Sequence, residues 1–348
     1  MSRNIFSYGL AELLGAALTL PAVSLLLALI LTVGIVTFTR GSSSDHRLAN
    51  LSDDAVMAVN ARYTRERRAL GIAALAVIFI FMAENIVRGY VLNMADVVSW
   101  WQFALPVFVA FVGLGVLLAV IRFGGSARPA HPAVLGARRT WTSFGPRAGL
   151  VGAGVAVVAL LVTTITAGVA SSPDSRGRYI YLEILIPNES IDPIRPWFYG
   201  WAYGVPVLAC LAALTAVTLV ALHLNAVRPF LRPETAGVEQ TARSGIAAGA
   251  VHLATAAMLL ALAGAWRFIA SSGSISGLVV QGDTPQSGTY EAAWRYAEFA
   301  AIAGWLAPVV EIAGFVLLLL VIRQLRRMPV RDQSPALTTQ TTDSEVVR

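Results

Sequence analysis

Residues 298–322 read EFAAIAGWLAPVVEIAGFVLLLLVI, a stretch that is almost entirely apolar. About 20 apolar residues in a helix are enough to cross the hydrocarbon core of a bilayer. Six further stretches of this kind lie at about 10–38, 69–90, 101–121, 148–170, 199–224 and 245–269. The sequence therefore predicts an all-α integral membrane protein with seven transmembrane helices. We interpret the first stretch as a retained helix, because its apolar part is too long for a signal peptide.

The composition supports this fold class and excludes others. Of the 348 residues, 56% are hydrophobic and 13% are charged, whereas a soluble domain has about 25% charged residues. These values exclude a water-soluble globule and a disordered chain, and a single cysteine, Cys210, excludes a disulfide scaffold. All 26 basic residues are arginine, so no lysine can form a Schiff base with retinal or hold a nucleotide phosphate. Arginine without lysine also indicates a GC-rich bacterial genome, and hence a multi-pass protein of the bacterial plasma membrane.

The positions of the arginines predict the orientation. Of the 26 arginines, 19 lie in the segments 39–68, 122–147, 228–243 and 323–348. Because arginine accumulates on the cytoplasmic side, these segments are expected inside, with the N-terminus outside and the C-terminus cytoplasmic. Seven of the eight tryptophans lie near the opposite, outer helix ends. They are typical of an interfacial belt, and the alternative is an aromatic-lined outer vestibule.

A recurring pattern suggests an internal repeat. The helices starting near residues 69, 148 and 245 begin with similar runs, such as Gly71-Ile-Ala-Ala and Gly245-Ile-Ala-Ala. The helices between them share a tryptophan followed by Pro-Val, as at Trp305 and Pro308. The chain is thus interpreted as one single helix plus three helical hairpins that are parallel repeats of one another. The alternative is that a composition rich in Ala, Gly, Leu and Val mimics such a pattern.

The segments outside the apolar stretches are short. Residues 1–331 are expected to form a single transmembrane domain, and 332–348 a disordered cytoplasmic tail. In the outer loop 171–198, partial alternation of polar and apolar residues favours a short strand or hairpin, whereas the outer loop 270–297 is expected to be irregular. Inside, Ser52-Asp53-Asp54 resembles a helix start, which predicts a helix over 52–68 that runs into the second membrane helix.

Glu311 is the main candidate for chemistry, because an ionisable group at membrane depth is costly and therefore functional by default. It lies near the middle of the last helix, twelve residues before Arg323, which is about 18 Å along a helix. The functional interpretation is a proton or cation relay. The alternative is a neutral carboxylic acid that hydrogen-bonds to a neighbouring helix.

Four further charged residues form a candidate outer polar site. Glu84 and Arg88 are four residues apart, so they share one helix face, and a structural ion pair is expected there. The alternative for this pair is a role facing a substrate. Arg267 and Glu298 lie at the outer ends of the last two helices and are expected to pair across that hairpin.

Two histidines are weaker candidates. His223 and His252 lie one or two turns inside the cytoplasmic ends of adjacent predicted helices. Such a pair could ligate a haem or a metal, but helix packing through hydrogen bonds is the simpler interpretation. No sequence motif of a zinc protease or of a serine hydrolase is present. We therefore expect no catalytic residue, no cofactor and no metal.

Three functional hypotheses follow. The first is a non-enzymatic permease or transporter that uses Glu311 as a proton or ion relay. The second is a non-catalytic accessory or sensor subunit, because the sequence shows no second charge at the depth of Glu311. The third is an intramembrane haem or redox enzyme that uses His223 and His252. The expected partners are the lipid bilayer and a protein partner or a second copy of the chain, without nucleic acid.

Overall fold

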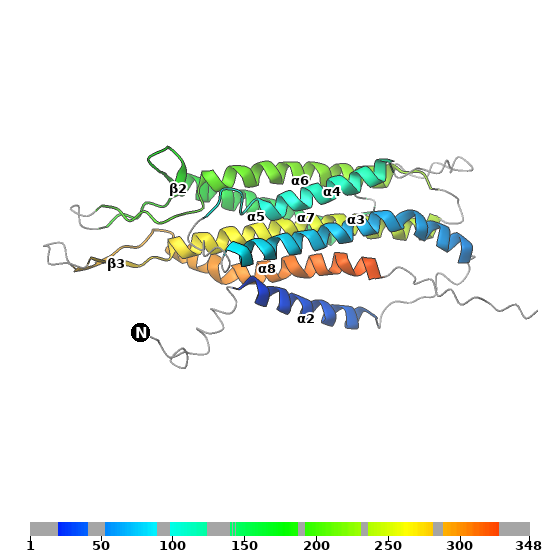
Figure 1. The fold of residues 1–348 in the computed structure, drawn as a ribbon, viewed down its shortest axis with the longest axis horizontal. Helices are drawn as coiled ribbons and strands as arrows, with labels where there is room; N and C mark the ends of the chain where they lie inside the picture. Colours follow the sequence, from blue (N-terminus) through cyan, green and yellow to red (C-terminus); the bar gives the residue numbers. More distant parts are fainter. Residues whose placement is uncertain are drawn as a thin grey trace, which may run out of the picture.

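The computed structural model describes residues 20–40, 53–88, 98–123, 140, 142, 144–186, 192–230, 236–280 and 288–326. Within these ranges the chain is mainly helical, and seven helices are long and apolar enough to cross a membrane. This architecture is compatible with a polytopic membrane protein (Figure 1). The helices are α2 (Pro21–Arg40), α3 (Asp53–Ile86), α4 (Leu105–Phe123), α5 (Arg147–Ala170), α6 (Trp201–Val227), α7 (Ala236–Gly273) and α8 (Ala297–Arg326).

The observed helices agree with the apolar stretches, with differences at their ends. The predicted helix at 10–38 is helical over Pro21–Arg40, and residues 10–19 lie outside the described ranges. The helix expected over 52–68 is the first part of α3, which begins at Asp53 and continues without a break into the apolar stretch. α7 extends beyond the predicted 245–269 at both ends. The predicted tail, 332–348, lies outside the described residues.

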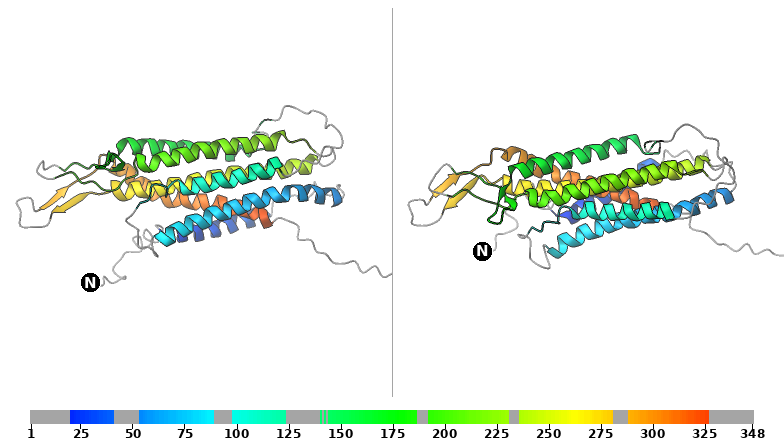
Figure 2. Two further views of the ribbon diagram at one scale, coloured as in Figure 1. Left: turned by 45° about the horizontal axis from the view of Figure 1, so that its top comes forward. Right: turned by 90° about the horizontal axis from the view of Figure 1, so that it is seen from above.

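α7 lies at the centre of the bundle. It packs against α3, α4, α5, α6 and α8, while α2 packs at the periphery, mainly against α8 (Figures 1 and 2). Its sequence is rich in alanine and glycine, and small residues let helix backbones approach closely. The closeness is visible at Gly314 of α8, where an added Cβ would lie 3.2 Å from the carbonyl oxygen of Ala256.

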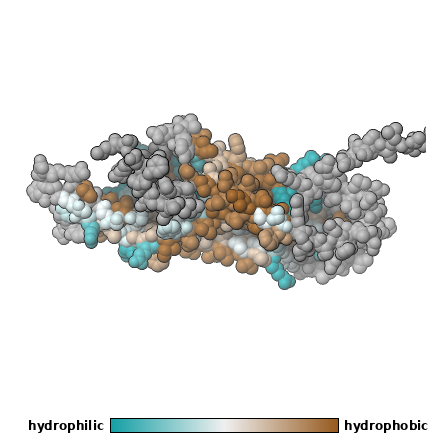
Figure 3. Space-filling view, turned by 90° about the horizontal axis from the view of Figure 1, so that it is seen from below, coloured by the Kyte–Doolittle hydropathy of each residue, from teal (hydrophilic) through white to brown (hydrophobic). Residues whose placement is uncertain are grey.

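The outer surface of the bundle is apolar. Phe38 is 89% exposed and Phe79 is 73% exposed, which is the arrangement expected where lipid replaces water around the helices. In Figure 3 the hydrophobic residues gather along the middle of the molecule, and hydrophilic residues lie toward its two ends. The middle of the bundle is therefore the part suited to a bilayer core.

Two β hairpins stand at one end of the bundle, which we call the hairpin end. β1 (Ser172–Pro173) pairs antiparallel with β2 (Tyr179–Tyr181), as the alternation in 171–198 predicted. β3 (Gly277–Val280) pairs antiparallel with β4 (Gly288–Glu291). The prediction of an irregular loop over 270–297 was wrong there, because valine, threonine and tyrosine favour strands once a partner strand is present.

The possible repeat and the orientation stay predictions. The helices of each proposed hairpin do pack together, as α3 with α4, α5 with α6, and α7 with α8. Their packing is unequal, however, because α7 is mostly buried, whereas α3 and α5 are mostly exposed. The end of the bundle opposite the two β hairpins is the one rich in arginine, and the predicted orientation places that end in the cytoplasm.

Candidate functional site

Arg267 and Glu311 form an ion pair between α7 and α8. The prediction that Arg267 pairs with Glu298 was wrong, and the register of the two helices explains why. Gly304 of α8 packs against Ala270 of α7, so these two residues lie at the same depth. Arg267 precedes Ala270 by three residues and therefore lies about one turn further from the hairpin end. Glu298 is an exposed residue of the first turn of α8, about two and a half turns closer to the hairpin end than Arg267. The arginine side chain therefore reaches inward to Glu311.

Glu311 is buried, with 1% of its side chain exposed, and Arg267 is 24% exposed. In the described part of the structure, neither carboxyl oxygen of Glu311 accepts a hydrogen bond. The neighbouring helix thus supplies a cation, rather than the hydrogen bond to a neutral acid that one interpretation of the sequence required. A buried carboxylate whose counter-ion is partly exposed is sensitive to any charge that approaches the arginine.

A partly open cavity of about 1110 Å³ adjoins this pair. It extends from Ser274, at the hairpin end of α7, to Leu260 and Pro308 within the bundle, and α3, α4, α7 and α8 form most of its wall. Aromatic side chains supply much of its apolar lining: Phe81, Phe103, Trp197, Phe268 and Trp305. Its polar lining consists of Glu84, Asn85, Gln102, Arg267, Ser271, Ser272 and Ser274.

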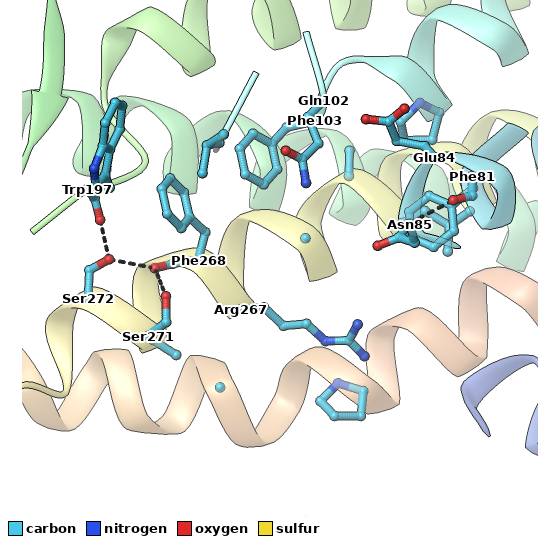
Figure 4. A pocket seen from close by; sticks show the side chains of 18 of the residues that line it. Phe81, Glu84, Asn85, Gln102, Phe103, Trp197, Arg267, Phe268, Ser271 and Ser272 are labelled. Atoms are coloured by element: carbon cyan, nitrogen blue, oxygen red, sulfur yellow. Dashed lines mark hydrogen bonds between the residues drawn. The ribbon is translucent and has the colours of Figure 1, made fainter. Parts of the chain in front are cut away.

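Figure 4 shows how the polar groups surround this space. Arg267 extends from α7 toward α8, and Glu84 and Asn85, both on α3, lie to its upper right in the view. The hydroxyl of Ser272 donates to the carbonyl oxygens of Trp197 and Phe268, which ties the end of α7 to the segment before α6. The cavity is therefore mostly apolar, with a few polar groups in fixed places, as in most small-molecule sites.

The predicted pair of Glu84 and Arg88 is confirmed. The Nε of Arg88 lies 3.1 Å from Oε1 of Glu84. Arg88 also donates to Gln102 and Ser99, and its guanidinium lies 5.9 Å from the ring centroid of Trp101. These contacts join the end of α3 to the segment before α4. Arg88 thus fixes the position of this part of the cavity wall. Glu84 lines the cavity, whereas its counter-ion Arg88 does not.

The two candidate histidines differ in their surroundings. His223 is exposed on α6, whereas His252 is half-buried on α7, and its Nδ1 is buried with no hydrogen-bond partner in the described part of the structure. Among the described residues, no group of three or more His, Cys, Asp or Glu side chains is arranged to hold a metal ion. The haem hypothesis therefore gains no support from these positions and stays a prediction.

A buried ionic network at the opposite end of the bundle was missed from the sequence. Arg243 has no exposed surface, and it contacts Glu239 of its own helix at 3.3 Å and the hydroxyl of Tyr63 on α3 at 3.1 Å. It also donates to the carbonyl oxygens of Arg228 and Pro229. The four-residue spacing of Glu239 and Arg243 was the available signal, but the arginines there were interpreted as topological anchors only.

A second pair extends this network. Arg228, just after α6, pairs with Glu66 of α3, which is 2% exposed, and it donates to the carbonyl oxygen of Ile121 at 3.3 Å. Asn225 donates to the backbone oxygen of Arg243 at 3.0 Å. The ends of α4 and α6 are thus joined to α3 and α7, mainly by charge-assisted hydrogen bonds, which are the stronger kind. This end of the bundle is closely tied, whereas the hairpin end contains the cavity.

Comparison of the chain with models of known protein families, with curated proteins and with solved structures finds no match.

Proposed function

We propose that this protein is a permease of the bacterial plasma membrane and that Glu311 is its proton relay. The observation that carries the proposal is the ion pair of Arg267 and Glu311 beside a large, partly open cavity. A buried acid in a bundle of apolar helices is typical of a proton or ion pathway. The cavity supplies what such a pathway requires, which is a space for a solute next to the acid.

The pair suggests how a proton and a solute are coupled. Arginine stays protonated throughout, so Glu311 is the partner that changes charge. When Glu311 is ionised, it neutralises Arg267; when Glu311 takes a proton, the guanidinium requires another anionic or polar partner. The charge state of Glu311 therefore determines what the cavity presents to a solute.

The contrast between the two ends supports the same function. A permease closes one end of its pathway while the other is open. Here the ionic network of Glu66, Arg228, Glu239 and Arg243 joins the helices at the end opposite the cavity. If that end is cytoplasmic, as the arginines predict, the described state is open toward the outside.

An accessory or sensor subunit remains the second hypothesis, but one of the observations that favoured it no longer holds. It was favoured by the absence of a second charge at the depth of Glu311, and Arg267 supplies that charge. A subunit of this kind would copurify with a stoichiometric partner and would accumulate no solute by itself.

Accumulation in proteoliposomes tests the proposal. Purified protein is reconstituted, an inward proton gradient is imposed, and uptake is measured for a panel of radiolabelled apolar carboxylates, amino acids, organic amines and sugars. We expect one class to accumulate only when the gradient is present, and we expect Glu311→Gln to abolish that accumulation.

Glu298→Gln is the matched control, because Glu298 is an exposed acid in the first turn of the same helix. This variant should transport as the unmodified protein does. Uptake that persists in Glu311→Gln, or no gradient-dependent uptake of any class, would contradict the proposal.

A further inference from the structure

The cavity next to Glu311 has a wall whose chemistry selects among ligand classes. Arg267 is its one basic lining residue among the described residues, and its side chain is 24% exposed. Glu311, the counter-ion of Arg267, does not line the cavity and is almost fully buried. A ligand in the cavity therefore meets the guanidinium, while the carboxylate lies behind it.

The other lining charge is less available. Glu84 is paired with Arg88, and Arg88 is held in turn by Gln102 and Ser99. A ligand cation that approached Glu84 would have to compete with an arginine fixed by several contacts. By contrast, Arg267 itself lines the cavity, whereas Arg88 does not. The pair of Arg267 and Glu311 is thus the one whose arginine a ligand can reach directly.

The balance of charge around Arg267 determines whether a proton has to bind together with the ligand. An anion that pairs with Arg267 would leave an excess negative charge at membrane depth, which is costly. The excess disappears when Glu311 takes up one proton. An uncharged ligand gains nothing from Arg267, and an organic cation would be repelled by it.

We infer that the cavity binds an organic anion, a carboxylate on an apolar or aromatic body, and that Glu311 takes up one proton when the anion binds. The ligand carboxylate replaces that of Glu311 as the partner of Arg267, and the proton comes from solution. On release the ligand leaves Arg267, Glu311 returns its proton to solution, and the original ion pair forms again. The apolar body lies against the aromatic wall at Phe81, Phe103 and Phe268. The assignment depends on the proposed function, since it names the substrate class of the same site.

Calorimetry on the purified protein tests this assignment without requiring transport. The protein is placed in nanodiscs of phosphatidylcholine and titrated with 2-naphthoate and decanoate, and with the uncharged 2-naphthamide and decanamide. Repeating each titration in buffers of different ionisation enthalpy gives the number of protons taken up per ligand. We expect the carboxylates to bind about 10- to 100-fold more tightly than the amides, the range expected for a charged hydrogen bond. One proton should be taken up with each carboxylate.

The variants separate the two residues. Arg267→Gln should lose most of the preference for carboxylates, and Arg267→Lys should keep part of it, which guards against a simple folding defect. Glu311→Gln, which mimics the protonated acid, should bind carboxylates with no proton uptake. Glu298→Gln should behave as the unmodified protein does.

The same anionic chemistry could come from a lipid, so a final arm adds phosphatidylglycerol to the nanodiscs. Competition with 2-naphthoate would identify a lipid anion as the occupant, and no competition would identify a soluble acid; either result keeps the anion assignment. Equal binding of acids and amides, or binding of acids without proton uptake, would overturn it.

Failure of the proposed function is a different result. If carboxylates bind with proton uptake but no solute accumulates in proteoliposomes, transport fails and the binding assignment holds. If a solute accumulates in a Glu311-dependent way and amides bind as well as acids, transport holds and the assignment fails.

Discussion

The side chain of Arg267 points in a direction that its position in the sequence does not indicate. By position it belongs with the polar residues near the helix ends, but its long side chain reaches inward to Glu311. Long side chains near helix ends usually turn toward the water. Here the buried carboxylate favours the opposite direction, because leaving a charge without a partner inside the bundle costs more than burying part of the guanidinium.

Glu66 and Arg228 give a prediction about stability. Glu66→Gln leaves the charge of Arg228 without its partner, so we expect the variant to lose about 3–5 kcal/mol of stability. Thermal unfolding of the protein in detergent should show a clearly lower midpoint. The double variant Glu66→Gln/Arg228→Gln should regain part of the loss, because no unpaired charge remains. Equal midpoints for the unmodified protein and Glu66→Gln would show that the pair is not formed.

The candidate residues could be predicted from the sequence in part. Glu311 was identifiable because it is an acid in the middle of an apolar run, and Glu84 with Arg88 because their spacing places both on one face. The partner of Arg267 could not be predicted, since it depends on the register between α7 and α8. The same is true of the contact between Arg243 and Tyr63, which are far apart in the sequence.

The contact between α3 and α4 depends on one glycine. A Cβ added to Gly113 would lie 2.5 Å from the Cβ of Ala73, whereas one added to Gly115 would meet nothing within 4 Å. We therefore expect Gly113→Ala to destabilise the bundle by about 1–3 kcal/mol through overpacking. Gly115→Ala, two positions along the same helix, is the control.

The control should be neutral or stabilising by up to about 1 kcal/mol, because alanine favours helix over glycine. Thermal unfolding of the two variants side by side measures the difference. Equal unfolding midpoints would mean that α3 and α4 do not approach as closely as described.

The turn between β1 and β2 depends on Asp174. The backbone N–H of Arg178 donates to its carboxylate at 2.8 Å, and the Arg178 guanidinium and the backbone N–H of Arg176 also donate to it. These bonds hold the pKa of Asp174 below its ordinary value of 3.8. They favour the ionised form, so their contribution is complete above pH 3.8 and is lost as the pH falls through the lowered pKa.

We therefore expect the amide protons of Arg176 and Arg178 to stay protected from hydrogen exchange down to about pH 4 and to lose protection below it. Asp174→Asn should weaken their protection at neutral pH. Protection that is the same in the variant would mean that the carboxylate does not hold the turn.

Helices were easier to predict than strands here, for a physical reason. An apolar run long enough to cross a bilayer is a local signal, so all seven stretches appear as helices. The pairing of Gly277–Val280 with Gly288–Glu291 is not local, because each strand is stable only beside the other. The alternation before Tyr181 was strong enough to indicate a strand, whereas the run after Ser276 was not.

At the scale of the whole molecule, the cavity lies at one end of the bundle and the ionic network at the other. The orientation in the membrane determines which of these ends faces the cytoplasm. In a Cys210→Ser background, Ser274→Cys places a thiol at the hairpin end and Gly237→Cys places one at the other. Both positions are exposed. In intact cells, a membrane-impermeant maleimide should label position 274 and not position 237. The reverse pattern would invert the predicted orientation.

The central claim is that the carboxylate of a bound anion replaces that of Glu311 as the partner of Arg267, and that Glu311 then holds a proton. Infrared difference spectroscopy observes that proton directly, because a protonated carboxyl group has a C=O stretch that a carboxylate lacks. On addition of 2-naphthoate, we expect such a band to appear in the unmodified protein and in Glu298→Gln, and to be absent in Glu311→Gln. A bound ligand with no new band, or a band that persists in Glu311→Gln, would contradict the account.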